Sequence, residues 1–240
     1  NSFIPPKTHS KKPKAGEKPW ISVRKVIEGL PKLDAKNKVS ASSKLPHHRV
    51  PVLDEDKYFW VSNTPPEGGA FDNQCIKCGF KGNPVHSSKK DDNGINRTDH
   101  NDTLHCIKCG ALLPRPWVKS DNTYRLMKGY TSAYRRMKWD DPATALTRNL
   151  SYACSDKKLH PEQNRVLSLY EAFLLHTITD FEYHWERLDG KKVSDKTIRE
   201  IIGESIPPRG LNKIINHIIK IYNGEITSSK EIQLNLFKSA

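Results

Sequence analysis

The chain has 240 residues, of which 35% are hydrophobic and 28% are charged, and its formal net charge is +13. No apolar run approaches the roughly 18 residues that a membrane-spanning helix needs, and the N-terminal residues contain no apolar stretch typical of a signal peptide. We therefore expect a polar protein without a membrane span, built as one large domain or two modest ones.

The positive charge is concentrated in two parts of the chain. Residues 1–50 contain 12 Lys and Arg against 3 Asp and Glu, and residues 111–150 contain 8 against 3. The counts are 7 against 9 in residues 51–110 and 13 against 12 in residues 151–240. Localised positive charge indicates a polyanionic partner, and the excess at 111–150 is the better evidence because its arginines alternate with aromatic residues. For residues 7–18 a solvated basic tail remains the alternative.

The first hundred residues carry weak signals of secondary structure. Residues 1–19 are rich in Pro and Lys and are expected to be extended, and a short helix follows, with Ser22 as its N-cap and Gly29 near its end. The segment KYFWVS at 57–62 predicts a strand, and residues 63–69 predict a turn. The polar residues 87–102 predict a loop.

The C-terminal half predicts three helices. The segment 168–178 begins at a capping box formed by Ser168 and Glu171, and the segment 194–203 begins at Ser194 as its N-cap. The third helix has an apolar face at the spacing i, i+3, i+4, i+7, i+8 and i+11, formed by Leu211, Ile214, Ile215, Ile218, Ile219 and Tyr222.

The tetrapeptide Cys-Ile-Lys-Cys occurs twice, each time followed by Gly, and 27 residues separate Cys78 from Cys106. Zinc prefers four soft or borderline ligands in a tetrahedron, and two such motifs supply four thiolates. We therefore predict a closed structural zinc site held by Cys75, Cys78, Cys106 and Cys109. His86, His100 and His105 are alternative ligands. A redox dithiol is the weaker interpretation, because two matched copies are not expected for it.

The most specific pattern lies in residues 129–181. It reads Arg-Met-x-Trp-Asp-x-Pro and Thr, then His-Pro-x-x-x-Arg-x-Leu-Ser-x-x-Glu-Ala, at Arg136, Met137, Trp139, Asp140, Pro142, Thr147, His160, Pro161, Arg165, Leu167, Ser168, Glu171 and Ala172. This ordered set resembles the C-terminal part of DNA cytosine-5 methyltransferases. The segment IIGESIPP at 201–208 resembles the closing segment of these enzymes, although Glu204 stands where Asn is usual. Residues 5–10 and the helix after them resemble the linker that precedes their recognition region.

The resemblance implies an α/β fold, mixed α+β in this fragment. Residues 1–34 would be a linker and short helix from the catalytic-domain side, and residues 35–128 a target-recognition domain stapled by zinc. Residues 129–224 would hold conserved motifs and C-terminal helices that pack on a Rossmann-like domain, and residues 225–240 a tail. That Rossmann-like domain would be the one that binds S-adenosylmethionine.

The resemblance also implies methyl transfer from S-adenosylmethionine to cytosine C5 in double-stranded DNA. The family's Pro-Cys nucleophile and Phe-x-Gly-x-Gly cofactor loop do not occur in this sequence, and Cys154 follows Ala153 rather than Pro. We therefore expect no catalytic residue here. The expected partners are DNA and a catalytic half, on the same longer chain or on a separate subunit. A bacterial restriction–modification system, cytoplasmic and associated with the nucleoid, is the expected setting.

The resemblance suggests which residues meet DNA and cofactor. Base-reading candidates are Arg97, Arg115 and Arg125, and candidates for phosphate contact or for bracing the domain are Arg135, Arg136 and Arg148. Thr144 and Thr147 are expected to contact the DNA backbone or to cap a turn. The segment Gly203, Glu204 and Ser205 would line the pocket for S-adenosylmethionine. The apolar face of residues 211–222 is expected to be exposed, or covered by a protein partner.

Two other functional classes stay open. One is a non-enzymatic, zinc-containing DNA-binding protein derived from such a methyltransferase, which would not co-purify with a catalytic polypeptide. The other is a zinc-ribbon module for protein interaction, against which salt-dependent DNA binding would argue.

Overall fold

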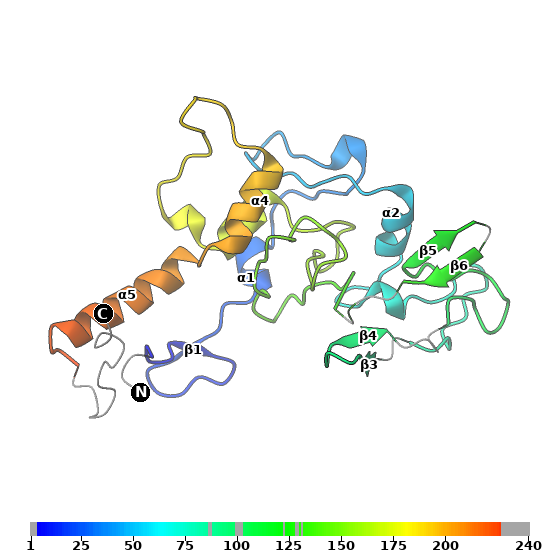
Figure 1. Ribbon diagram of the computed structural model, residues 1–240, viewed down its shortest axis with the longest axis horizontal. Helices are drawn as coiled ribbons and strands as arrows, with labels where there is room; N and C mark the ends of the chain where they lie inside the picture. The colour runs from blue at the N-terminus through cyan, green and yellow to red at the C-terminus, as the bar shows by residue number, and fades with distance from the viewer. Residues whose placement is uncertain are drawn as a thin grey trace.

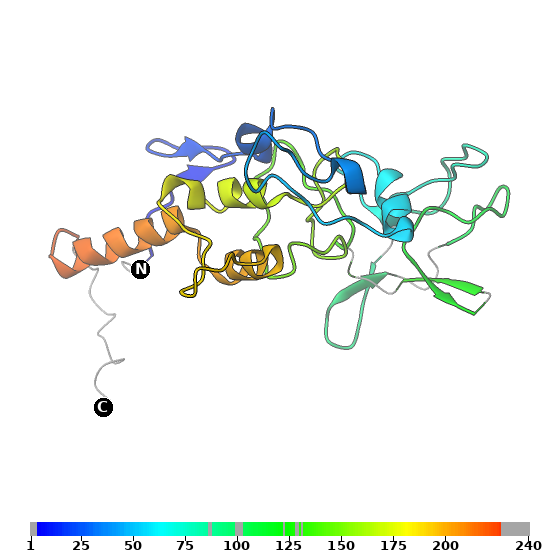
Figure 2. The same ribbon diagram turned by 90° about the horizontal axis from the view of Figure 1, so that it is seen from above.

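The computed structural model describes residues 4–226, with the exception of residues 86, 87, 99–102, 122, 128, 129 and 131. The molecule is elongated (Figures 1 and 2). At one end lie β1 (His9–Ser10), β2 (Lys18–Pro19) and the last helix, α5 (Pro208–Tyr222). At the other end lie β3 (Ser88–Lys90), β4 (Asn96–Thr98), β5 (Trp117–Ser120) and β6 (Thr123–Leu126).

The remaining helices lie between these ends. They are α1 (Val23–Ile27), α2 (Glu55–Ser62), α3 (Leu169–Leu175) and α4 (Asp195–Glu204). Short 3-10 turns occur at Asn37–Val39, Ala70–Asp72 and Ile178–Asp180.

The strands pair only as narrow ribbons. β1 and β2 run parallel, whereas β3 pairs with β4 and β5 with β6 in antiparallel register, with Trp117 opposite Leu126 and Ser120 opposite Thr123. The expected mixture of helices and strands is therefore confirmed. Among the described residues no sheet exceeds two strands, so the wide parallel sheet of a Rossmann-like domain is not part of them.

The predicted helix starts are confirmed by their caps. The Ser22 hydroxyl accepts a hydrogen bond from the Lys25 N–H, and the Ser194 hydroxyl accepts one from the Thr197 N–H at 3.1 Å. At the start of α3 the predicted capping box is complete, because the Ser168 hydroxyl accepts from the Glu171 N–H at 3.0 Å and the Glu171 carboxylate accepts from the Ser168 N–H at 2.7 Å.

The predicted strand at 57–62 is wrong, because these residues belong to α2. The Asp54 carboxylate caps this helix by accepting the Lys57 N–H at 2.8 Å, and Glu55 and Asp56 follow in the first turn, where negative charge favours a helix N-terminus. The aromatic residues suggested a strand, but the acidic cap before them decides the local structure.

The largest core cluster joins α2 to the residues before α3. Its buried members are Trp60, Val61, Ala70, Phe71, Leu104, Trp117, Ala133, Tyr134, Ala153, Leu159 and Val166. Residues on both sides of position 128 thus share one core. The boundaries expected at 34, 128 and 224 stay predictions.

Two smaller clusters hold the helices. Leu150, Leu169, Ala172, Phe173, Ile198 and Ile202 pack α3 against α4. Val23 and Ile27 of α1 pack against Met137 and Leu167. The pattern that resembles the methyltransferase family therefore lies largely in the structural centre of the molecule.

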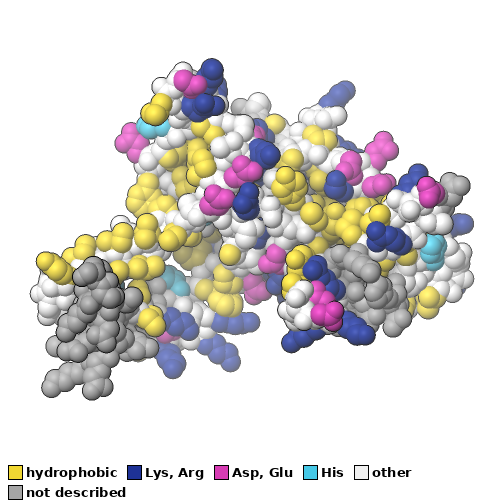
Figure 3. Space-filling model, in the orientation of Figure 1, with side chains coloured by type: hydrophobic (Ala, Val, Ile, Leu, Met, Phe, Trp, Pro, Cys, Tyr) yellow, Lys and Arg dark blue, Asp and Glu magenta, His cyan; other side chains and the backbone are white. Residues whose placement is uncertain are grey.

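The helix α5 leaves its apolar face uncovered. The side chains of Leu211, Ile214, Ile215, Ile218, Ile219 and Tyr222 are between 38% and 90% exposed. In Figure 3 hydrophobic side chains run along the visible side of this helix. The expectation of an exposed apolar face is confirmed. None of the described helices is both long enough and apolar enough to cross a membrane.

Candidate metal centre and basic cleft

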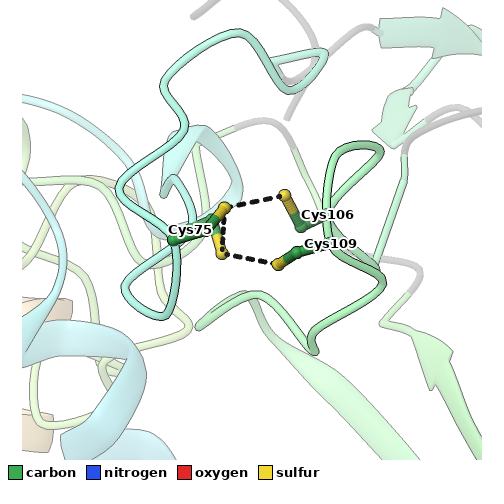
Figure 4. Close-up of side chains that lie close together, drawn as sticks. Cys75, Cys106 and Cys109 are labelled. Carbon is green, nitrogen blue, oxygen red and sulfur yellow. Dashed lines mark hydrogen bonds between the residues drawn. The ribbon is translucent and has the colours of Figure 1, made fainter.

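The two Cys-Ile-Lys-Cys motifs meet in space. The sulfurs of Cys75, Cys78, Cys106 and Cys109 all lie within 4.8 Å of one another. Adjacent pairs are 3.5 Å (Cys75 and Cys78), 3.6 Å (Cys75 and Cys109) and 3.7 Å (Cys78 and Cys106) apart. Figure 4 shows the sulfurs of Cys75, Cys106 and Cys109 turned toward a common centre. All four cysteines are free thiols.

The two motifs fold into the same local turn. The N–H of Cys75 donates to the carbonyl of Phe80 at 3.3 Å, and the N–H of Cys106 donates to the carbonyl of Ala111, also five residues later, at 2.8 Å. The glycines that follow the motifs have nearly equal positive φ angles, 68° at Gly79 and 69° at Gly110. Glycine adopts this conformation without steric cost, so each repeat can form its turn independently.

The turns favour the ionised form of the inner cysteines. The N–H of Cys78 is the largest influence on the Cys75 thiol and lowers its pKa. Desolvation raises the pKa of the Cys106 thiol, but hydrogen bonds from the N–H groups of Lys108 and Cys109 and from the side chains of Asn83 and Cys75 together outweigh it and bring the pKa to about 6. Thiolate is the form that binds metal.

The geometry fits zinc. Four sulfurs at the usual Zn–S distance of about 2.3 Å form a tetrahedron with edges of about 3.8 Å, close to the three separations above. A zinc ion held there by four protein ligands would be closed to substrate, and its role would be structural. His105 is exposed and its N–H donates to the Thr103 hydroxyl. His86 and His100 lie outside the described residues.

Two buried polar side chains tie the motifs to each other, and sequence reasoning assigned neither of them this role. The amide oxygen of Asn83, which follows the first motif, accepts the N–H of Ile107 in the second at 2.9 Å. Arg115 donates to the carbonyl of Asn73 at 2.8 Å and to that of Thr103 at 2.7 Å, and these residues precede the two motifs. Arg115 is 1% exposed. Arg115 was expected to read bases, but in this structure it braces the two Cys-Ile-Lys-Cys motifs, residues 73–83 and 103–115, which together we call the metal module.

Arg136 is also buried, with 2% of its surface exposed. Its guanidinium donates to the carbonyls of Val61, Thr64 and His160 at 2.9–3.1 Å. Burial lowers its pKa to about 10. The structure therefore places this residue as a brace between the end of α2 and the turn at His160, which was one of its two expected roles.

A cleft of about 680 Å³ is lined in part by Arg136 and carries more basic than acidic side chains. Those that reach its surface are Lys11, Arg135, Lys138 and Lys157, against the acidic Glu67 and Asp141. The Glu67 carboxylate already accepts the N–H of Trp139 at 2.8 Å. Three predicted DNA-contacting residues, Arg135, Arg136 and Thr144, line this cleft. Counting charges segment by segment along the sequence could not show that Lys11, Lys138 and Lys157 share one cleft, because each lies in a different segment.

The Thr144 side chain is held in place by the buried Lys158. Its hydroxyl accepts a hydrogen bond from the Lys158 ammonium at 3.3 Å, and the same ammonium donates to the carbonyl of Ala145 at 2.7 Å. Lys158 is fully buried, and desolvation lowers its pKa. Its neighbour Lys157 is exposed in the cleft. Adjacent lysines thus have opposite roles, one supporting the loop and one presenting charge.

The other predicted DNA contacts lie outside this cleft. Arg97 on β4 pairs with Asp91 at 3.0 Å and lies 4.4 Å from the centre of the Tyr130 ring. Arg125 is exposed on β6. Thr147 and Arg148 are exposed on the loop that packs against α4.

The predicted cofactor segment contacts this same loop. A Cβ placed on Gly203 would lie 2.0 Å from the backbone nitrogen of Arg148, so the glycine is required for close packing. The Glu204 carboxylate lies 3.6 Å from the Arg148 guanidinium, and both side chains are exposed. The Ser205 hydroxyl donates to the carbonyl of Ile202 at 3.2 Å. Gly203 is therefore a packing residue, whereas Glu204 and Ser205 are exposed, and the contact of this segment with S-adenosylmethionine stays a prediction.

Comparison with known proteins gives two relatives. The chain is 36% identical over 101 residues to the type II methyltransferase M1.HgaI of Avibacterium volantium, an alignment that covers 38% of this chain and 27% of the relative. This chain is similar to type II methyltransferases. It is 33% identical over 93 residues to the type II methylase M.HgiDII of Herpetosiphon aurantiacus, covering 39% of this chain and 25% of that protein. The match thus spans about a quarter of each relative's length. No family model matches the chain.

Proposed function

We propose that this chain is the DNA-recognition part of a DNA cytosine-5 methyltransferase of a bacterial restriction–modification system, acting in the cytoplasm on the nucleoid. Its own residues grip and read the duplex. A catalytic half, which binds S-adenosylmethionine, carries out methyl transfer to cytosine C5. The similarity to type II methyltransferases supports the enzyme class, and the cytosine specificity rests on the pattern in residues 129–181.

The basic cleft is the observation that carries this proposal. Lys11, Lys157 and the neighbours Arg135 and Lys138 come from three parts of the chain and place their charges around one cavity, with the Arg135 guanidinium also paired with Asp72 at 3.1 Å. Phosphate contacts of this kind supply most of the sequence-independent affinity of a DNA-binding protein. The Thr144 hydroxyl accepts from Lys158 and donates to the carbonyl of Lys157 at 3.4 Å, a long bond that it can exchange for one to a phosphate oxygen.

The metal module is the second part of the recognition surface in this proposal. Each repeat exposes an Ile and a Lys between its cysteines, with Ile76 57% and Ile107 63% exposed and both Lys77 and Lys108 at the surface. An apolar side chain next to a cation suits a groove of the duplex, where methyl groups and phosphates lie close together. Arg97 and Arg125, on the neighbouring ribbons, are the base-reading candidates. Arg115 and Arg136 act as braces, because both are buried.

The exposed face of α5 is the surface for the catalytic half. Its apolar side chains are too numerous and too continuous for an isolated surface helix. The relatives are about four times as long as the segment that they share with this chain, so most of a complete methyltransferase remains to cover this face.

DNA binding tests the central claim. We expect the zinc-loaded chain to bind a 20-base-pair duplex in fluorescence anisotropy, with an affinity that falls steeply as salt rises. Lys138→Glu and Lys157→Glu should each reduce the slope of log K against log salt by about 1. The matched control is Lys196→Glu on α4, which does not line the cleft. Absence of binding at low salt would refute the proposal.

A second experiment tests the division of labour. Co-expression with a polypeptide that carries the Pro-Cys motif should give a complex that transfers labelled methyl groups to cytosine, whereas the chain alone should transfer none. Ile218→Asp on α5 should abolish the complex and leave DNA binding unchanged. Methyl transfer by the chain alone, or a complex that survives Ile218→Asp, would contradict the proposed arrangement.

A further inference from the structure

A second cavity, of about 530 Å³, adjoins the basic cleft, and Ser132 lines both. Its wall includes two tyrosines, an amide, a thiol and a carboxylate, contributed by Tyr130, Asn149, Tyr152, Cys154 and Asp156. The volume lies in the range of small-molecule sites, about 300–1,000 Å³. None of the DNA contacts in the proposed function involves this cavity.

The two tyrosines of this cavity keep their rings at the surface. Tyr130 is 50% exposed and Tyr152 is 51% exposed, whereas Tyr134, between them in sequence, is 1% exposed in the core. The Arg97 guanidinium lies 4.4 Å from the centre of the Tyr130 ring. A cation at this distance holds the ring by a cation–π interaction. Exposed aromatic rings beside a basic groove are the usual platform on which proteins stack single nucleobases.

The polar groups of the cavity suit the edge of a base. The Asn149 amide offers a donor and an acceptor, and the Asp156 carboxylate offers acceptors only. Together they match a base with an exocyclic amino group, which donates, beside a ring nitrogen, which accepts. In a paired duplex the faces of such a base are covered by the neighbouring bases, so only a base that has left the stack can lie against the two tyrosine rings.

We propose that this cavity binds an unpaired, amino-bearing nucleobase of DNA whose backbone lies in the basic cleft. The inference rests on the proposed function and adds a ligand that the DNA contacts above do not include. Tyr130 and Tyr152 stack the base, and Asn149 and Asp156 bind its edge. The exposed thiol of Cys154 lies in the wall of the site and undergoes no reaction with the base.

Cys154 makes the site testable in the intact protein. The other four cysteines gather in the metal module, so with zinc bound a maleimide should label Cys154 selectively, as peptide mass mapping can verify. The probes are two 20-base-pair duplexes that differ by one extra, unpaired adenine in the centre of one strand. We expect the duplex with the bulge to bind about tenfold more tightly, the fold-change of one stacked base. At equal occupancy it should also slow labelling of Cys154 about tenfold relative to the fully paired duplex.

Variants separate stacking from general DNA binding. Tyr152→Ala should remove the preference for the bulge without weakening binding of the paired duplex, and Tyr152→Phe should keep the preference because the ring remains. Tyr222→Ala is the matched control, because Tyr222 is an exposed tyrosine on α5 that does not line the cavity.

The failures of the two proposals are distinguishable. Equal affinity for both duplexes, or equal protection of Cys154 by both, overturns this inference and leaves the proposed function standing. Persistence of the preference in Tyr152→Ala also overturns it. Absence of binding to either duplex at low salt overturns the proposed function together with the inference.

Discussion

Replacement of Cys106 by Ser should release zinc and unfold the turns of both Cys-Ile-Lys-Cys motifs, while α3 and α4 keep their structure. Cys106 is 2% exposed and its sulfur is one corner of the tetrahedron. A serine hydroxyl does not replace a thiolate on zinc. The helices α3 and α4 are packed by a separate cluster of apolar residues, so the damage should remain local.

The magnitude follows from the loop that the metal closes. A cross-link that closes the 27 residues between Cys78 and Cys106 removes about 3–4 kcal/mol of chain entropy from the open state, by the relation used for disulfides. Among the described residues, the apolar cluster beside the four cysteines has only Cys75, Cys106 and Leu113 as buried members. Burial of one such side chain stabilises by about 1.5–3 kcal/mol, whereas ordering each residue costs about 1–2 kcal/mol. The turns of the two Cys-Ile-Lys-Cys motifs therefore cannot remain folded without the metal.

Hydrogen exchange with mass spectrometry is the direct assay, combined with metal analysis. A loss of about 3–4 kcal/mol corresponds to a fall in protection of about two to three powers of ten, expected in residues 73–83 and 104–115 but not in α3 or α4. DNA affinity should fall with it. Cys154→Ser is the matched control and should retain one zinc per chain. Full protection and normal DNA affinity in a zinc-free Cys106→Ser protein would refute the reasoning.

Other predictions concern the core and the packing of α4. The Glu171 carboxylate pairs with the Arg165 guanidinium at 2.6 Å, and both side chains are fully buried. Burial raises the pKa of Glu171, but the interaction with Arg165 outweighs burial, so the pKa is lowered overall. The pair should therefore stabilise the fold above about pH 4.5 and lose this effect as pH falls. In denaturant titrations Glu171→Gln should destabilise by about 3–5 kcal/mol at pH 7 and less at acidic pH; a constant difference would contradict this. Gly203→Ala should lower the melting temperature, costing about 1–3 kcal/mol, because its Cβ overlaps the backbone at Arg148. Gly210→Ala, in open space on α5, should stabilise by up to about 1 kcal/mol; equal effects of the two substitutions would exclude the steric explanation.

Structural features that are set by residues close together in the sequence were predictable. The capping box of Ser168 and Glu171 and the cap at Ser194 place helix starts through contacts only three residues apart. The four cysteines could be grouped because each repeat forms its own turn and zinc requires four ligands. The apolar face of α5 follows from the spacing of its isoleucines, which needs no tertiary information.

The failed prediction at 57–62 shows the limit of local composition. Tyr58, Phe59 and Trp60 suggested a strand, but the capping carboxylate of Asp54 favours the helix that forms. Trp60 and Val61 are adjacent and both buried, a pattern that alternation along a half-exposed strand does not allow.

The roles of the charged residues depended on long-range packing. All arginines look alike in the sequence, yet Arg115 and Arg136 are buried braces that donate to main-chain carbonyls, whereas Arg125 and Arg148 are exposed. Whether a guanidinium can reach a ligand is decided by the segments that surround it, and these are up to 75 residues away in the case of Arg136.

The sequence by itself determined the grouping of the four cysteines, most helix starts and the resemblance to methyltransferases, because each depends on residue types at short, regular spacing. Only the tertiary structure decided which lysines share a cleft and that Gly203 packs on the loop at Arg148. It also decided that two tyrosines flank a cavity beside that cleft. These relations join residues far apart in the chain, and their geometry is set by how the whole core packs.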